Sequence, residues 1–338
     1  MIFSRRSNAV LRLARAAVVT AAAAAAGCAT ASRFDATAAR FDASSLPSVE
    51  LADVPFFPQK QFQCGPAALA TILAYEGLDV DPDALAPAVY VKGLKGSLQA
   101  ELLAATRRHG LIPYVLEPTA DDLFAEVRSG KPVLVLENLA LPRVPVWHYA
   151  VVVGFDAERG DVVLRSGKRR RHTERLGRFL RHLRLGGDWA FVALGPDEPP
   201  PATATPERYV RALAGAEPLL GAAADAAYSS ALTRWPRDPL VLFAGAGHEL
   251  AAARYENAAG LYETLLALEP HHAAARNNLA NALAEQGCRT EALHQARAAL
   301  ADVANESPLR SAIEDTVGSL ERDAAAAAAA PEPASCAR

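Results

Sequence analysis

The chain has 338 residues, of which 51% are hydrophobic and 22% charged, and its formal net charge is −3. This composition fits one or two folded domains and excludes a chain that is disordered throughout. The small net charge provides no global basic surface of the kind that nucleic-acid-binding domains carry, so we expect no nucleic-acid partner.

The N-terminal segment 1–28 has the features of an export signal. Four arginines precede an apolar stretch at 16–26, which is too short to span a bilayer comfortably. The stretch ends in AAGC, which resembles a bacterial lipobox, although alanine stands at its first position where leucine is usual. The resemblance implies a lipoprotein in which Cys28 is lipidated. Residues 29–50 are small and polar, and we expect them to form a tether between the membrane and the first domain.

Two other interpretations of this segment stay open. Arg5-Arg6 could begin a twin-arginine signal, although the residues after it fit that pattern poorly. The segment is also compatible with an ordinary cleaved signal in which the cysteine is incidental. Because Ala29 rather than Asp follows the cysteine, the lipoprotein interpretation predicts the outer membrane of a Gram-negative cell, on the side facing the periplasm.

Hydrophobic periodicity predicts an α+β domain over 51–196, with folded sequence beginning near Val54. The expected helices precede the expected strands, an order typical of α+β domains rather than alternating α/β domains. We expect helices at 67–76, 98–109 and 120–129, and strands at 132–138, 147–155, 161–165 and 189–194. Five prolines then interrupt the pattern, and they predict a linker at 197–206.

A repeated pattern follows in 207–322. Tyr228 aligns with Tyr262, and Pro236 aligns with Pro270, so both pairs have the same offset. This offset equals the period of tetratricopeptide repeats, which form an all-α domain, and about two and a half to three units fit the segment. We expect these repeats to bind a protein partner; an alanine-rich bundle with accidental periodicity is the alternative. The low-complexity residues 323–338 predict a disordered tail.

One of the four cysteines has the surroundings of a nucleophile. Cys28, Cys64, Cys288 and Cys336 show no paired spacing of the metal-binding or redox kind, so we predict no metal site, no cofactor and no disulfide framework. Cys64 precedes a Gly-Pro pair at the start of a predicted helix. Unpaired backbone amides and the helix dipole favour the thiolate at such a position, and the thiolate is the reactive form.

A cysteine nucleophile needs a base, and His148 is the histidine in a strand-like context, VWHYAVVVGFD. The other histidines fall at a helix end, in a basic segment or in the repeats. A cysteine at a helix start with a histidine on a later strand is the arrangement of papain-like hydrolases. We therefore predict Cys64 as the nucleophile and His148 as the base.

The segments VPFFPQKQFQCGPAALATIL, GSLQAELLAATRRHGL and WHYAVVVGFD together resemble papain-like cysteine peptidases related to bacteriocin-processing double-glycine peptidases. The resemblance extends from residue 54 to about residue 194. It implies hydrolysis of a peptide bond in a peptide or protein substrate through a thioester, although acyl transfer would use the same residues. It also implies that a glutamine before the cysteine helps to form the oxyanion hole. Gln59 matches this position, whereas Gln61 and Gln63 lack the preceding proline.

The sequence departs from this family at the third catalytic position. The family usually has Asp on the strand after the histidine strand, and Ser166 occupies that position here. Asn138, at the end of the preceding strand, is a second candidate for orienting His148. A neutral orienting residue is compatible with a Cys-His pair. The departure leaves open a non-catalytic assembly lipoprotein that acts through its repeats.

Residues 165–184 form a basic segment, with nine Lys or Arg against one Glu. One interpretation is a solvated strand-loop-helix surface. The other is a contact for anionic lipid or for an acidic substrate beside the active site.

Overall fold

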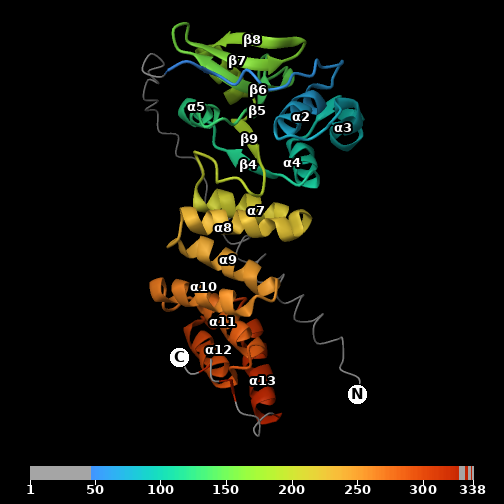
Figure 1. The fold of residues 1–338 in the computed structure, drawn as a ribbon. Helices are drawn as coiled ribbons and strands as arrows, with labels where there is room; N and C mark the ends of the chain where they lie inside the picture. Colours follow the sequence, from blue (N-terminus) through green and yellow to red (C-terminus); the bar gives the residue numbers. More distant parts are fainter. Residues whose placement is uncertain (1–46, 327–331, 334–335, 337–338) are drawn as a thin grey trace. The chain divides into compact units, whose positions relative to one another are not determined.

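A computed structural model describes residues 47–326, 332–333 and 336 of the chain. The chain divides into two compact units after Trp235. In the described part, the sheet unit spans 47–235 and the helical unit begins at Pro236 (Figure 1). The predicted signal segment, Cys28 and most of the predicted tether lie outside the described residues. Among the helices that are described, none has both the length and the apolar character needed to cross a membrane.

The sheet unit is built on an antiparallel sheet of seven strands, in which β4, β9, β5, β6, β7 and β8 lie side by side in that order and β1 pairs with β6. The strands are β1 (Val49–Glu50), β4 (Ile112–Leu116), β5 (Val133–Asn138), β6 (Trp147–Asp156), β7 (Asp161–Ser166), β8 (Arg169–Arg175) and β9 (Trp189–Leu194). A separate small hairpin pairs β2 (Tyr90–Val91) with β3 (Gly96–Ser97).

Helices cover both faces of this sheet, and Figure 1 shows α5 and the group α2, α3 and α4 on opposite sides of the strands. The helices are α2 (Cys64–Tyr75), α3 (Pro82–Val89), α4 (Gln99–Arg108), α5 (Ala120–Arg128) and α6 (Leu176–Leu185). On one face, Leu136 and Tyr149 share a buried core with α2. On the other, Phe124 of α5 stacks against Phe155, with ring centroids 4.5 Å apart.

The sequence therefore predicted the α+β architecture of this unit correctly, but the elements that it missed include α3, β4 and β8. α3 contains Pro87 and was not expected as a helix. β4 contains Pro113, which an edge strand tolerates because one side of its backbone needs no partner. β8 reads RRRHTER and has no apolar alternation, because it is the other edge of the sheet and is mostly exposed.

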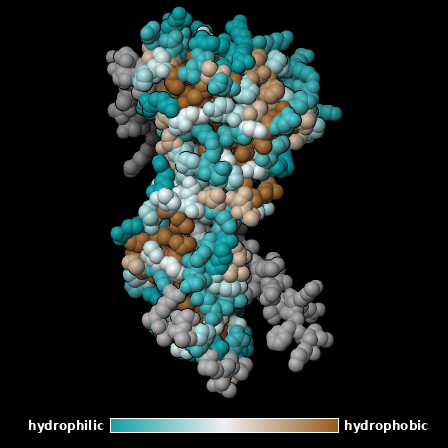
Figure 2. All heavy atoms as spheres, viewed as in Figure 1, coloured by the Kyte–Doolittle hydropathy of each residue, from teal (hydrophilic) through white to brown (hydrophobic). Residues whose placement is uncertain are grey.

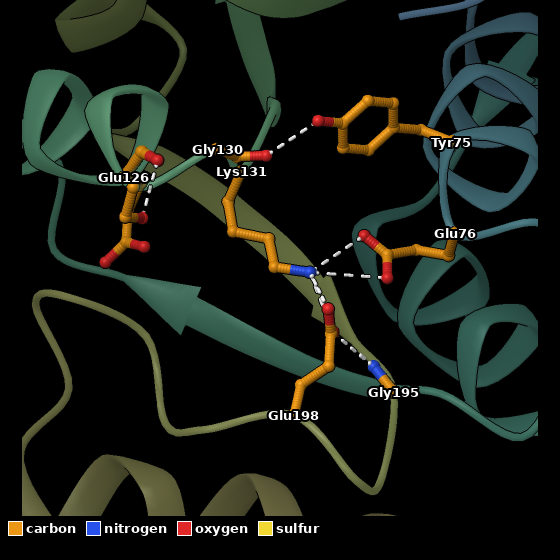
Figure 3. A network of polar contacts seen from close by, with 8 residues as sticks. Tyr75, Glu76, Glu126, Gly130, Lys131, Gly195 and Glu198 are labelled. Carbon is orange, nitrogen blue, oxygen red and sulfur yellow. Dashed lines mark hydrogen bonds and ion pairs between the residues drawn. The ribbon is translucent and has the colours of Figure 1, made fainter.

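The proline-rich segment predicted as a linker packs against the sheet unit instead. Glu198 of this segment lies 2.6 Å from Lys131 Nζ, and Lys131 Nζ lies 3.1 Å from Glu76 Oε1. Figure 3 shows the ammonium group of Lys131 between these two carboxylates. The buried Glu126 accepts hydrogen bonds from the backbone N–H and the hydroxyl of Thr203, at 2.7 and 2.6 Å. The prolines correctly indicated a break in regular structure. They could not indicate the polar partners that hold this segment against the sheet unit.

Two further helices belong to the sheet unit, α7 (Pro206–Leu220) and α8 (Ala224–Arg234). α7 packs on β4 and α4 and buries Tyr209, Leu213 and Ala216 completely. The sequence placed the start of the helical domain at residue 207, whereas the division in the structure follows Trp235. Helical periodicity cannot show which core a helix joins, and this boundary was therefore set too early.

The helical unit contains α9 (Pro239–Ala251), α10 (Tyr255–Leu268), α11 (Ala273–Glu285), α12 (Arg289–Asp302) and α13 (Arg310–Ala326). The start of α11 follows the start of α9 at the same offset as the start of α12 follows that of α10. This offset is also the one between Tyr228 and Tyr262. Alanines recur at the same offset and have no exposed surface, so that neighbouring helices can approach closely. These alanines are Ala246 with Ala280, and Ala258 with Ala292.

The end of the chain is fastened to the helical unit at the residues that are described there. Cys288 and Cys336 form a disulfide, with their Cα atoms 5.2 Å apart. Glu332 accepts hydrogen bonds from the backbone N–H and the hydroxyl of Thr290, at 2.8 and 2.9 Å. The expectation of no disulfide framework thus missed this pair, and most of the predicted tail at 323–338 lies outside the described residues. The two cysteines are 48 positions apart, with α12 and α13 between them, and such spacing gives no sign of pairing.

Candidate active site

Cys64 is the first residue of α2, and the residues that follow it up to Leu73 are buried. The glycine after it is required by close packing. A Cβ atom added at Gly65 would lie 2.3 Å from Ser97 Oγ, closer than atoms approach in proteins. The Gly-Pro pair therefore lets the start of α2 pack against β3 and holds Cys64 at the end of the helix.

Cys64 lines a small pocket together with Phe57, Gln59, Tyr149 and Ser166. The backbone N–H of Gln59 donates a hydrogen bond of 3.0 Å to the carbonyl of Gly167, which ties the chain before α2 to the turn after β7. The structure therefore places three of the predicted residues, Gln59, Cys64 and Ser166, around one pocket.

Burial raises the pKa of the Cys64 thiol above its ordinary value. Backbone N–H groups of Tyr149, Gly65 and Cys64 itself act in the opposite direction, because they stabilise the thiolate. Their effect is the one expected at a helix start, but it is smaller than the effect of desolvation. The net result of these opposing effects is a pKa of the Cys64 thiol above its ordinary value.

His148 is buried on β6, and its Nε2 lies 2.8 Å from Ser166 Oγ. Burial, together with the nearby charge of His172, lowers the pKa of His148 to about 4. The imidazole is therefore neutral at pH 7.

No hydrogen bond joins Cys64 to His148 in the described structure. Tyr149 packs in the core that includes Cys64, and His148 is its neighbour on β6. His148 is the cross-strand partner of Glu137, and its contact with Ser166 places it beside a residue that also lines the pocket of Cys64. The two predicted catalytic groups thus lie near the same strand without direct contact.

Asn138 has a structural role that differs from the predicted one. Its side-chain oxygen accepts hydrogen bonds from the backbone N–H groups of Ala140 and Val146, at 3.1 and 3.0 Å. These bonds shape the loop between β5 and β6. Of the two candidate orienting residues, Ser166 is the one that contacts His148.

The loop between β5 and β6 exposes an unusual number of hydrophobic side chains, a feature that the sequence analysis did not single out. Figure 2 shows hydrophobic patches among the hydrophilic residues that cover most of the visible surface. Five of the exposed hydrophobic residues belong to this loop and the start of β6: Leu139, Leu141, Val144, Val146 and Trp147. The stretch NLALPRVPVW is more apolar than a solvated loop requires. This composition could have indicated the exposed hydrophobic residues from the sequence alone.

The basic segment is not uniformly exposed. Arg165 is buried, and its guanidinium donates hydrogen bonds to the carbonyls of Val54 and Ala52, at 3.1 and 3.2 Å. It therefore fastens the N-terminal segment to β7. The arginines of β8 are exposed, as the interpretation of a solvated surface expected.

One family model matches part of the chain. Residues 51–167 match the model of the Peptidase_C39 like family. The comparison with curated proteins gives no match.

Three solved structures are similar at low identity. A protein from Bacillus anthracis described as a C39-like peptidase has 18% identity and a TM-score of 0.38, over 44% of this chain and 98% of that one. The peptidase domain of Streptococcus ComA, a bifunctional ABC transporter, has 16% identity and a TM-score of 0.34, over 42% and 98%. A double-glycine-motif protease from an AMS/PCAT transporter, solved with a leader peptide, has 20% identity and a TM-score of 0.33, over 44% and 98%. Residues 51–167 of the sheet unit are thus similar to the C39-like peptidase family, and the prediction of a cysteine peptidase is confirmed at that level.

Proposed function

We propose that the protein is an exported, lipid-anchored cysteine peptidase that cleaves a peptide bond through a thioester on Cys64. The observation that carries this proposal is the pocket in which the free cysteine at the start of α2 meets Gln59 and Ser166, with His148 hydrogen-bonded to Ser166. The pocket lies within the part of the chain that matches the peptidase family.

The chemistry assigns one role to each residue. Cys64 Sγ attacks the carbonyl carbon of the substrate while the thiol proton passes to His148. The Gln59 side-chain amide and the Cys64 backbone N–H stabilise the oxyanion. His148 then gives the proton to the leaving amine as the C–N bond breaks. Water hydrolyses the thioester, which releases the carboxylic acid and restores the thiol.

This mechanism requires a change from the resting geometry. His148 has to come within hydrogen-bond distance of Cys64 when substrate binds, as catalytic hydrogen bonds often tighten only in the substrate complex. The bond from His148 Nε2 to Ser166 leaves Nδ1 as the ring nitrogen that would take the thiol proton.

A substrate-trapping experiment tests the proposal. Cys64→Ala protein should retain an envelope protein or peptide that wild-type protein cleaves, and mass spectrometry should identify the two new chain ends. His148→Ala should retain the same protein without cleaving it. A captured protein that wild-type enzyme leaves intact would contradict a peptidase.

A second candidate function is a non-catalytic assembly protein that acts through its helical repeats. It is favoured by the resting site, in which burial raises the pKa of Cys64 and lowers that of His148, and in which the described structure has no hydrogen bond between the two side chains. Tetratricopeptide repeats are supported by the common offset between helix starts in the helical unit, which equals the period of such repeats. Under this function, Cys64→Ser would leave the biological activity intact, whereas deletion of the repeats would abolish it.

The proposed location is the outer membrane of a Gram-negative cell, with the lipid on Cys28. The Cys288–Cys336 disulfide supports export, because disulfides persist in the periplasm and are rare in the cytosol. Cys28→Ser should move the protein from the membrane fraction to the soluble periplasmic fraction. An unchanged membrane fraction would contradict anchoring by lipid at this residue.

A further inference from the structure

Three titratable side chains meet on the sheet face that carries α6, away from the pocket of Cys64. They come from three elements: Glu137 from β5, Glu174 from β8 and His182 from α6. One ligand atom of each lies within 4.8 Å of the others. His182 Nδ1 is 3.2 Å from Glu174 Oε1 and 3.8 Å from Glu137 Oε1.

The inference depends most on Glu137. Its side chain is only 2% exposed and points into this cluster. Its Oε1 and the Nδ1 of His182 are both buried without a hydrogen-bond partner in the described structure. A buried carboxylate without a partner is costly. Burial and the neighbouring charge of Glu174 accordingly raise the pKa of Glu137 to about 8.

We propose that Glu137, Glu174 and His182 bind a divalent metal ion of the zinc type. Imidazole and carboxylate are ordinary zinc ligands, and bond lengths of about 2.0–2.1 Å in a tetrahedral site put neighbouring ligand atoms about 3.3 Å apart. The two distances measured from His182 bracket this spacing. Magnesium and calcium prefer sites made of oxygen ligands, so the imidazole favours zinc.

Charge supports the same assignment. Two carboxyl groups face one imidazole, and a dication would stabilise both of them as carboxylates and accept a lone pair from each unpartnered atom. Among the described residues, Arg178 also pairs with this cluster: its Nε lies 3.9 Å from Glu174, and its side chain is 68% exposed. Arg178 therefore contacts the rim of the cluster and does not supply a partner to Glu137.

The site would join three elements beside the candidate active site. Glu137 is the cross-strand partner of His148 in the register of β5 and β6. A metal ion here would fasten β8 and α6 to β5, and it would fix the strand on which His148 is carried. Three protein ligands leave a fourth position for water.

Zinc titration of the full chain, purified without a histidine tag and stripped with a chelator, tests this site. Calorimetry should show one bound zinc ion per chain, and zinc should raise the thermal midpoint of the wild type. Glu137→Gln and His182→Gln should each lower the zinc affinity at least tenfold and abolish the thermal shift. Cobalt, added in place of zinc, should give the visible absorption of a tetrahedral site in the wild type only.

Two control variants locate the metal. Cys64→Ser should bind zinc as the wild type does, which separates this site from the thiol pocket. His294→Gln should also bind normally, because His294 pairs with Glu291 at an exposed position of the helical unit. If Glu137→Gln does not fold, Glu174→Gln provides the same test from the rim. Absence of zinc binding, or binding that survives these substitutions, would overturn the proposal in favour of a protonated His182 between two carboxylates.

Discussion

Burial determines the protonation states of the candidate site at the scale of single residues. It raises the pKa of the Cys64 thiol and lowers the pKa of His148 to about 4. Both shifts act against a Cys-His ion pair in the resting structure. Substrate binding would have to bring the two groups together before the thiol is activated.

Thiol labelling tests the state of Cys64. Iodoacetamide should label it slowly at pH 7, and the rate should keep rising above pH of about 8.5, where an ordinary thiol is half ionised. Cys64→Ser should abolish labelling and hydrolysis without loss of the fold, because a helix start tolerates serine. Labelling that persists in this variant without reductant would contradict the assignment, since Cys288 and Cys336 are bonded to each other.

Ser166 is the second residue-scale test. Ser166→Ala removes a neutral hydrogen bond to His148, and turnover should fall several-fold, on the order of 1 kcal/mol in the barrier. Ser166→Asp should instead stabilise the imidazolium and shift the pH profile of hydrolysis, because a carboxylate raises the pKa of a neighbouring histidine. Steady-state rates measured across pH separate the two effects. Unchanged rates and profiles in both variants would show that the bond to Ser166 has no catalytic role.

The buried imidazole also makes stability depend on pH. The pKa of His148 is lowered from 6.5 to about 4, so the folded state binds fewer protons than the unfolded state between these values. The contribution of the neutral His148 to the free energy of unfolding is complete above pH 6.5. It is lost as the pH falls toward 4, and the total loss is on the order of 3 kcal/mol. In urea unfolding experiments, the free energy of unfolding should fall less between pH 6.5 and 4 for His148→Gln than for the wild type. The exposed His294→Gln should follow the wild type.

At the scale of elements, polar contacts fasten the segment between β9 and α7 to the sheet. Lys131 has a side chain only 16% exposed and lies between Glu76 and Glu198 (Figure 3). Burial and the charge of Glu198 raise the pKa of Glu76 to about 7, although Lys131 acts against this shift. The lysine thus allows two carboxylates from distant parts of the chain to lie together.

Removal of this lysine should loosen the segment. Lys131→Met leaves two carboxylates facing each other, and it should lower the free energy of unfolding by about 3 kcal/mol, the low end for breaking a buried pair. The loss should be smaller at pH 5 than at pH 8, because Glu76 is then protonated. Limited proteolysis should also cut 196–205 faster. Lys60→Met, which removes an exposed pair with Asp83, should change the free energy of unfolding much less than Lys131→Met does, because exposed ion pairs contribute little. Equal effects of the two substitutions would contradict the role given to Lys131.

At the scale of the whole molecule, the chain consists of two compact units with separate means of stabilisation. The sheet unit has a core between the sheet and its helices, whereas the helical unit packs small side chains and is closed by a disulfide across 48 residues. Loop closure of this length stabilises the folded state by about 4 kcal/mol in the chain-entropy model.

Reduction of the disulfide should therefore affect one unit only. Cys288→Ser, or reductant added to wild type, should lower the free energy of unfolding of α9–α13 by about 4 kcal/mol. The effect should be confined to this unit because the closed loop lies within it. Hydrogen exchange followed by mass spectrometry reports each unit separately. Protection in β4–β9 should stay unchanged, and Cys64→Ser provides a matched cysteine variant. Loss of protection in both units would show that they unfold together.

The sequence alone determined the helices and strands that carry strong periodicity, and with them the α+β class. It also identified Cys64 at a helix start and His148 on a strand, because local residue patterns specify both features. The repeat offset read from the sequence recurs as the spacing of helix starts, since each helical pair is a local unit. These features depend on neighbours in the chain.

Only the tertiary structure revealed the contacts between residues that are far apart in the sequence, and the burial that these contacts produce. The partners of Glu198, the pairing of Cys288 with Cys336, and the burial of Arg165 each join segments far apart in the sequence. The pKa shifts of Cys64 and His148 also follow from the tertiary structure. Desolvation depends on everything packed around a group and not on its position along a helix or strand. For the same reason the meeting of Glu137, Glu174 and His182 has no local signature in the sequence.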